Sequence, residues 1–321
     1  MKMPNLLRSF IIILCITIVS NVTGQNVFSV RGNKTYLNDE VFQAIGLRCS
    51  NALLSDDSAS ELIKHLDEYR EYGLNTVSVY FMGSRYSNIN GFNRDGTLND
   101  VYAARMGRII RECDKRKMVV LVGILYWGSG MHDNSNAYYA GWKQEDINRA
   151  MSNTIKWLTD NNFKNVFVDP DNEGMSEREE KYDISAMACE GKNVNPSIPI
   201  AYNGRGIPPP CTDLAIHFGV KTPDKPYIQT EGTPEEYWGE YSKEKALNHY
   251  INIGIYTPTK IAQQLKQTRE LLDAGHGYLF ASTWLQNIPP NYDAGGYGTP
   301  CDPGMKWWLE FIRQNYTVRP E

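Results

Sequence analysis

Residues 165–175, NVFVDPDNEGM, are the stretch that decides the fold. Its first part is a short run of β-branched and aromatic residues, which is typical of a buried β-strand. Its second part changes to acidic and amide side chains and then to Gly174. In α/β barrels such a change marks the carboxyl end of a strand, where active sites lie. The stretch therefore predicts a strand that ends in a polar site.

Similar apolar runs recur along the chain and alternate with longer segments of helical periodicity, the pattern of a parallel sheet built from βαβ units. We predict eight sheet strands, at residues 43–47, 76–81, 118–125, 165–169, 198–202, 214–217, 227–231 and 278–283. Before them, residues 28–30 and 41–42 flank a turn around Asn38-Asp39 and predict an N-terminal β-hairpin.

Five segments with apolar residues at intervals of three and four predict helices, at residues 58–72, 101–116, 144–159, 259–274 and 305–314. Gly73 and Gly275 stand where glycines commonly end a helix. Residues 203–226 are interrupted by prolines, so we expect the helices after strands five and six to be reduced. The predicted fold class is α/β, a (β/α)8 TIM barrel. An open doubly wound sheet is the alternative, but residues 46–54, GLRCSNALL, lack its glycine-rich phosphate turn.

Residues 1–24 have the pattern of a cleavable secretory signal peptide. Lys2 and Arg8 precede the apolar run at residues 10–19, and small residues precede Gln25. A membrane anchor is the alternative, but the run is shorter than the roughly 20 residues that span a bilayer. We expect a secreted or periplasmic protein whose residues 25–321 form a single catalytic domain.

The charge balance excludes several classes of partner. The net charge is −4 for the whole chain and −6 for residues 25–321, because residues 1–24 carry two positive charges and no acids. Phosphate binding depends on clustered Lys and Arg. We therefore expect no nucleic acid and, after signal cleavage, no membrane as a partner. A neutral carbohydrate suits this balance, and we expect a monomer.

The cysteines argue against a metal site. Five remain after position 24, namely Cys49, Cys113, Cys189, Cys211 and Cys301, without the spacing of a zinc site. Export permits one or two disulfides whose pairing the sequence leaves open, and the odd number leaves at least one thiol free. We expect neither a metal nor another cofactor.

Two glutamates follow predicted strands. Glu173 lies in the polar segment after strand four, and Glu231 lies at the end of strand seven in residues 226–233, PYIQTEGT. Cleavage of a glycosidic bond requires one carboxyl group to protonate the leaving oxygen and a second to attack or support the anomeric carbon. Because the strand ends of a barrel meet at one face, this pair predicts a glycoside hydrolase. A solvated loop acid and a helix cap are the alternatives for Glu173 and Glu231.

Taken together, these stretches resemble clan A glycoside hydrolases, in particular the family 5 cellulase-like enzymes. Besides the two glutamates, the resemblance covers residues 69–81 (YREYGLNTVSVYF), 114–127 (DKRKMVVLVGILYW) and 277–286 (GYLFASTWLQ), and His217. It implies that Glu173 is the acid/base and Glu231 the nucleophile of a retaining enzyme. It also implies that Asn172 binds the 2-hydroxyl of the sugar.

Three positions depart from the family pattern. Gly174 stands where proline is usual, Ser78 where arginine is common, and Tyr126-Trp127 where histidine is common. These departures leave the subfamily and the substrate open.

Four further strand-end residues are candidates for substrate binding. Trp284, Tyr126 and Trp127 offer flat apolar faces for a sugar ring, or they cover the core. His217 can hold a catalytic carboxylate by hydrogen bonding, or it is a structural histidine. Asp169 and Asp171 in DPDN are more typical of a turn.

Two other functions have to be compared with the sequence pattern. A catalytically silent carbohydrate-binding barrel keeps the fold without turnover, since fold alone does not establish function. The pair of strand-end glutamates argues against it. An aspartic or metal-dependent hydrolase needs matched acid motifs or metal-spaced histidines, but the five histidines are scattered.

Overall fold

The structure, a computed structural model, describes residues 25–83, 89–127, 138–230, 258–281 and 305–317. Its centre is a sheet of eight parallel strands in the order β7-β6-β5-β4-β11-β10-β9-β8. The strands are β4 (Ile45–Arg48), β5 (Thr76–Tyr80), β6 (Val119–Leu125), β7 (Val166–Asp171), β8 (Ala201–Tyr202), β9 (Leu214–Ile216), β10 (Tyr227–Gln229) and β11 (Gly277–Phe280).

The two ends of this sheet meet between β7 and β8. The amide of Val168 donates a hydrogen bond to the carbonyl of Pro199 (2.9 Å), and Val168 forms a parallel bridge with Ile200. The sheet is thereby closed into a (β/α)8 TIM barrel. The predicted fold class is confirmed, with a strand at each of the eight predicted positions.

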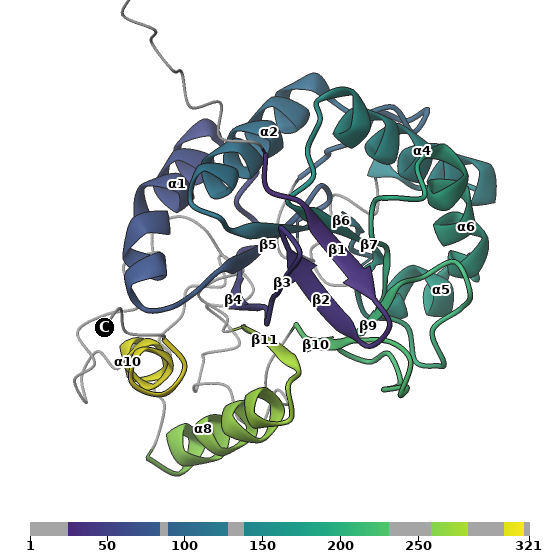
Figure 1. Cartoon of the computed structure of the whole chain (residues 1–321). Helices are drawn as coiled ribbons and strands as arrows, with labels where there is room; N and C mark the ends of the chain where they lie inside the picture. The colour runs from purple at the N-terminus through teal and green to yellow at the C-terminus, as the bar shows by residue number, and fades with distance from the viewer. Residues whose placement is uncertain (1–24, 84–88, 128–137, 231–257, 282–304, 318–321) are drawn as a thin grey trace, which may run out of the picture.

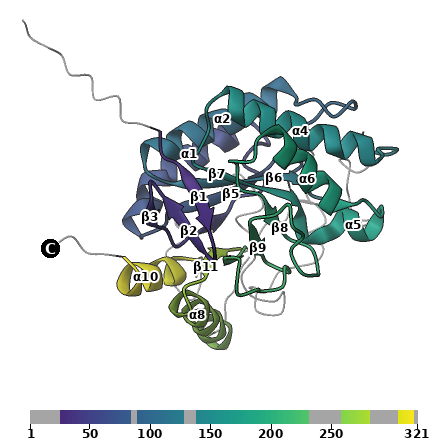
Figure 2. The same ribbon diagram turned by 45° about the vertical axis from the view of Figure 1, so that its right-hand side comes forward.

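Helices surround the barrel (Figures 1 and 2). They are α1 (Asp56–Glu71), α2 (Asp100–Lys115), α4 (Gln144–Asp160), α5 (Met175–Glu179), α6 (Ile184–Val194), α8 (Pro258–Asp273) and α10 (Lys306–Asn315). The five predicted helices are confirmed to within two residues at both ends, whereas α5 and α6 were not predicted. Residues 203–213 and 217–226 contain no helix, as predicted. No described helix is long and apolar enough to cross a membrane.

Local chemistry explains where α1 begins. The side-chain oxygen of Ser55 accepts a hydrogen bond from the amide of Ser58 (3.0 Å), which satisfies a group that the helix leaves unpaired. Asp56 and Asp57 in the first turn interact favourably with the positive end of the helix dipole. The helix therefore begins two residues before the predicted position.

A small antiparallel sheet closes the amino end of the barrel. It contains β1 (Phe28–Arg31), β2 (Lys34–Leu37) and β3 (Glu40–Val41), one strand more than the predicted hairpin. The amide of Phe28 donates to the carbonyl of Lys164 (2.8 Å), just before β7, and its ring lies 5.2 Å from that of Phe167.

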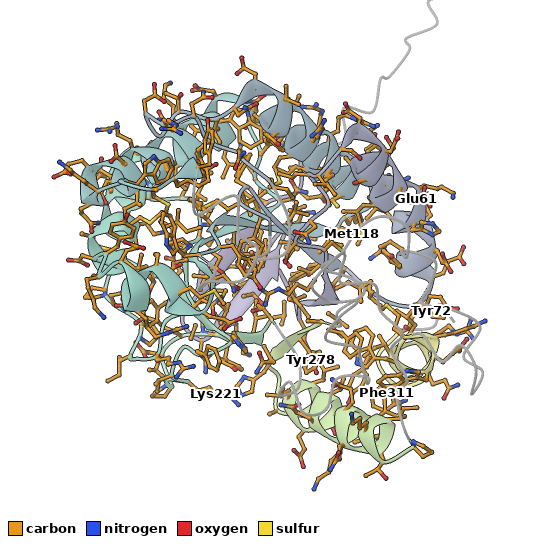
Figure 3. The ribbon with its side chains drawn as sticks, turned by 180° about the vertical axis from the view of Figure 1, so that it is seen from behind. Glu61, Tyr72, Met118, Lys221, Tyr278 and Phe311 are labelled. Carbon is orange, nitrogen blue, oxygen red and sulfur yellow. A yellow bond between two sulfur atoms is a disulfide. The ribbon has the colours of Figure 1, made fainter. Side chains whose placement is uncertain are left out.

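In Figure 1 this small sheet lies in front of the barrel, so the amino ends of the barrel strands face the viewer. Figure 3 is turned by 180° and therefore looks toward the carboxyl ends of these strands. In that view Tyr278 of β11 lies on the side that α8 and α10 cover, and its ring is 6.0 Å from that of Trp308. The polar strand ends therefore lie opposite the small sheet.

One disulfide, Cys189–Cys211, joins α6 to the segment after β8. Cys49 and Cys113 are buried free thiols, which agrees with the expectation that an odd cysteine count leaves a thiol free. Cys301 and the predicted signal peptide lie outside the described residues.

Replacing both Cys189 and Cys211 by serine is expected to lower the free energy of unfolding by about 3 kcal/mol. The disulfide closes a loop across a separation of 22 residues, and its loss restores the entropy of that loop to the unfolded chain. Denaturant unfolding of the oxidised wild type and the double variant measures the difference. Added reductant should destabilise the wild type alone, and equal midpoints for the two proteins would contradict the prediction.

Candidate active site

Glu173 lies at the carboxyl end of β7, on a tight turn of residues 172–174. Its φ of 57° and that of Gly174, 58°, place two successive residues in the left-handed region. For a residue other than glycine this conformation costs about 1 kcal/mol, and such strain is concentrated at functional sites. Asn172 is fully buried whereas Glu173 is partly exposed, so the turn brings the Glu173 side chain to the surface at the strand end.

The chain after the turn holds it in place. The guanidinium of Arg178 donates a hydrogen bond to the backbone carbonyl of Glu173. The buried carboxylate of Asp171 accepts from the amides of Ser176 (3.0 Å) and Glu177 (3.2 Å) in α5. Burial raises the pKa of Asp171 to about 7, and these hydrogen bonds oppose that rise. Asp171 thus stabilises the turn, as its position in the DPDN segment predicted.

Arg48, at the end of β4, sets the orientation of the Asn172 side chain. Its Nη2 donates to Asn172 Oδ1 at 2.6 Å. Arginine has no acceptor atom, so the amide oxygen must face Arg48 and the amide nitrogen must face away. Asn172 Nδ2 lies 3.3 Å from Glu173 Oε1 and donates to it. The side chain with the predicted sugar-binding role is therefore held with its N–H groups toward Glu173, the predicted acid/base.

A buried carboxylate lies beneath this pair. Asp169 Oδ2 accepts hydrogen bonds from the Tyr80 hydroxyl (2.6 Å) and from Asn203 Nδ2 (2.8 Å). Burial raises the pKa of Asp169, whereas the two hydrogen bonds and the charge of Arg48 lower it. We call Arg48, Tyr80, Asp169, Asn172 and Asn203 the Arg48–Asp169 network. It joins the ends of β4, β5, β7 and β8.

Glycine and aromatic rings shape the surroundings of the network. A Cβ at Gly123 of β6 would lie 1.9 Å from the Tyr80 ring, so only glycine allows the ring to lie there. The guanidinium carbon of Arg48 is 5.6 Å from the ring centroid of Tyr80 and 5.4 Å from that of Tyr126. The buried cation thus has both a nearby carboxylate and aromatic faces.

Asp169 was interpreted as a turn residue, but its carboxylate lies in this network. Three further members, Arg48, Tyr80 and Asn203, were not predicted as site residues. Each follows or ends an apolar strand, as the predicted site residues do. The polar strand-end signal that identified Glu173 was therefore present at all three positions. What the sequence lacked was the identity of their partners, which lie on other strands.

Tyr126 and Trp127 follow β6 and are each only 3% exposed. Tyr126 meets the edge of the Tyr80 ring at 5.5 Å, and Trp127 Nε1 donates to Glu180 Oε1 at 3.0 Å. Tyr126 therefore packs against the Arg48–Asp169 network, whereas Trp127 contacts residues that follow α5. Their predicted contact with substrate stays a prediction.

His217 follows β9 with a φ of 48°. Its Nδ1 lies 2.7 Å from Gln229 Oε1, and Gln229 Nε2 donates to the Tyr227 hydroxyl at 3.3 Å. Because the amide nitrogen of Gln229 faces Tyr227, its oxygen faces His217, and Nδ1 carries the proton in that bond. His217 is thus oriented by β10, two residues before Glu231. Its predicted role toward substrate stays a prediction.

Glu231 and Trp284 lie outside the described residues. The described part of the chain stops at the buried Thr230, directly before Glu231, and β10 lies between β9 and β11. The predicted roles of both residues therefore remain predictions.

Solved structures with a similar architecture include three carbohydrate-active enzymes. A family 5 glycoside hydrolase from Bacteroides vulgatus matches with a TM-score of 0.57 and 14% identity over 90% of this chain and 69% of that chain. A β-glucanase from Saccharophagus degradans, in complex with cellotetraose, matches with a TM-score of 0.58 and 11% identity over 90% of this chain and 94% of that chain. A β-mannanase from the blue mussel Mytilus edulis matches with a TM-score of 0.53 and 12% identity over 90% of this chain and 96% of that chain.

The chain has the fold of the family 5 glycoside hydrolases. The predicted resemblance is confirmed at this level. No protein-family model and no curated protein matches the sequence.

Proposed function

We propose that the protein is a retaining glycoside hydrolase that cleaves β-glycosidic bonds of an oligo- or polysaccharide by double displacement. The observation that carries the proposal is the orientation of Asn172 beside Glu173 at the end of β7, fixed by Arg48. A glutamate on a strained strand end, with an amide turned toward it, is arranged to act on a sugar that carries a hydroxyl beside the reacting carbon.

In the proposed reaction, Glu231 attacks the anomeric carbon while Glu173 protonates the departing oxygen. Glu173 then deprotonates the water that hydrolyses the glycosyl-enzyme. Asn172 donates a hydrogen bond to the 2-hydroxyl, and this bond strengthens as positive charge develops on the sugar ring. Such an interaction lowers the barrier because it is stronger in the transition state than in the ground state.

The solved structures with a similar fold guide the choice of substrate. They include enzymes named for β-glucan and β-mannan, so a β-linked glucan or mannan is proposed for this chain as well. Export is also proposed. Residues 1–24 support it, and so does the Cys189–Cys211 disulfide, since such bonds persist in oxidising compartments. N-terminal sequencing of the exported protein tests this part, and an intact Met1 would contradict it.

The proposed activity is tested by incubating the wild type and Glu231→Ala with aryl glycosides, β-glucan and β-mannan. The wild type should release products, and Glu231→Ala should release none above background. Binding of a polysaccharide without any product that depends on Glu231 would favour the catalytically silent barrel instead.

A further inference from the structure

We infer that Glu177 and Tyr202 together bind the hydroxyl groups of the sugar that leaves when Glu173 protonates the glycosidic oxygen. This inference rests on the proposed function and names a part of the substrate that the catalytic residues alone do not recognise. Glu177 is in α5, directly after the strained turn, and Tyr202 ends β8, the neighbour of β7 in the closed barrel.

Two glycines show that the Glu177 carboxylate and the Tyr202 hydroxyl converge on one place. A Cβ built on Gly204 would lie 2.4 Å from the Tyr202 hydroxyl oxygen and 2.9 Å from Glu177 Oε2. A Cβ built on Gly174 would lie 3.2 Å from the same Glu177 oxygen and 3.0 Å from Gly204 Cα. The two oxygens therefore meet beside Gly174, the residue that follows Glu173, and a side chain at 204 would collide with both of them.

Neither oxygen has a hydrogen bond within the described part of the chain, although Tyr202 is only 7% exposed. Burial raises the pKa of Tyr202, and the nearby charge of Glu177 raises it further. Burial likewise raises the pKa of Glu177. By contrast, Glu180 in the same region accepts a hydrogen bond from Trp127. The Glu177 side chain is partly exposed, and neither oxygen is among the fully enclosed side-chain atoms of the described residues that lack a partner. Both oxygens can therefore hydrogen-bond a ligand that lies over them.

A sugar supplies the complement that this pair needs. A carboxylate accepts hydrogen bonds from hydroxyl groups, and a phenol both donates and accepts, so two neighbouring hydroxyls satisfy both side chains. The position next to Glu173 selects the leaving sugar, because the acid/base must contact the oxygen that joins this sugar to the rest of the substrate. A nitrophenyl leaving group has no hydroxyls and gains nothing from the pair.

The test compares two substrates that share one glycone and differ in the leaving group. Cellotriose is set against nitrophenyl cellobioside, and mannotriose against nitrophenyl mannobioside, according to which glycone the enzyme accepts. Glu177→Ala and Tyr202→Phe should each lower kcat/KM on the trisaccharide about tenfold, the size expected for one lost hydrogen bond to a charged or buried group. On the aryl glycoside both variants should stay within about twofold of the wild type.

Gly204→Ala places a Cβ against both oxygens and should displace them, so it should also lower kcat/KM on the trisaccharide alone. Glu145→Ala, which changes an exposed acid at the start of α4, is the matched control and should leave both substrates unchanged. Equal losses on both substrates, or no loss on the trisaccharide, would overturn the Glu177–Tyr202 site while leaving the proposed function intact. A wild type that hydrolyses neither substrate would overturn the proposed function and this site with it.

Discussion

Glu231→Gly is expected to lower hydrolysis of every substrate by at least about 10⁴-fold, because no covalent glycosyl-enzyme can form without the nucleophile. Glu173→Gln should behave differently. It should lose roughly 10²–10⁴-fold on ordinary glycosides, which need a proton on the leaving oxygen, and should largely spare aryl glycosides with activated leaving groups. Steady-state kinetics on both substrate types separates the two roles.

Two further observations test the assignment of these carboxylates. Azide added to Glu173→Ala should occupy the vacated space and yield a glycosyl azide of retained configuration. NMR of the first product formed by the wild type should show the anomer of the substrate. An inverted first product would show that the nucleophile is wrongly assigned and that the two carboxyl groups lie further apart than the roughly 5–5.5 Å of retaining enzymes.

Arg48→Met is expected to lower kcat/KM by about 10²-fold and to destabilise the protein by about 3–5 kcal/mol. The activity falls because the Asn172 amide loses the donor that fixes its orientation. Stability falls because the buried Asp169 carboxylate loses its compensating cation. Arg48→Lys should keep part of the stability and less of the activity, because lysine restores the charge without the planar donor geometry. Kinetics and thermal unfolding measure the two effects.

The loss of stability should depend on pH in a defined direction. Without Arg48 the pKa of Asp169 rises further above that of the unfolded chain. A raised folded-state pKa means that stability is present at low pH, where the carboxyl is protonated, and is lost as the pH rises through the folded pKa.

Thermal unfolding of Arg48→Met should therefore differ least from the wild type in acid and most at neutral pH. The double variant Arg48→Met/Asp169→Asn should recover stability at neutral pH but not activity. Recovery of both would show that Arg48 acts only through the fold.

The barrel could be predicted from the sequence because each strand is indicated by a short run of apolar residues. The apolar run at residues 165–169 and the polar residues after it are local signals, and the same signal placed Glu173. Helix α6 was missed because Gly191 and Asn193 make it a poor helix by local propensity. A Cβ at Gly191 would lie 2.3 Å from Met151 Cε, so this glycine allows α6 to pack closely on α4. The need for a glycine at this position arises from the contact between the two helices, which local sequence does not show.

The Arg48–Asp169 network was missed for a related reason. Arg48 ends a strand in GLRCSN, a segment in which the sequence showed only the absence of a phosphate turn. Its partner Asn172 is 124 positions away. The partner of a charged residue at one strand end becomes known only when the barrel brings the other strand end beside it. Ser78 stands where many family 5 enzymes have an arginine. A buried arginine, Arg48, nevertheless lies on the neighbouring strand β4, so the loss of the arginine at 78 does not leave this part of the site without a positive charge.

The attachment of the first described residues has a practical consequence for handling the protein. The side chain of Asn26 donates to the backbone carbonyl of Asp114 (2.7 Å), and its backbone amide donates to the carboxylate of the same residue (3.0 Å). The chain is thus fastened to α2 near the amino end of the barrel, opposite the strand ends that carry Glu173. Linking the protein through its amino terminus to a bead or a sensor surface should therefore leave the candidate active site turned outward, open even to an insoluble polymer.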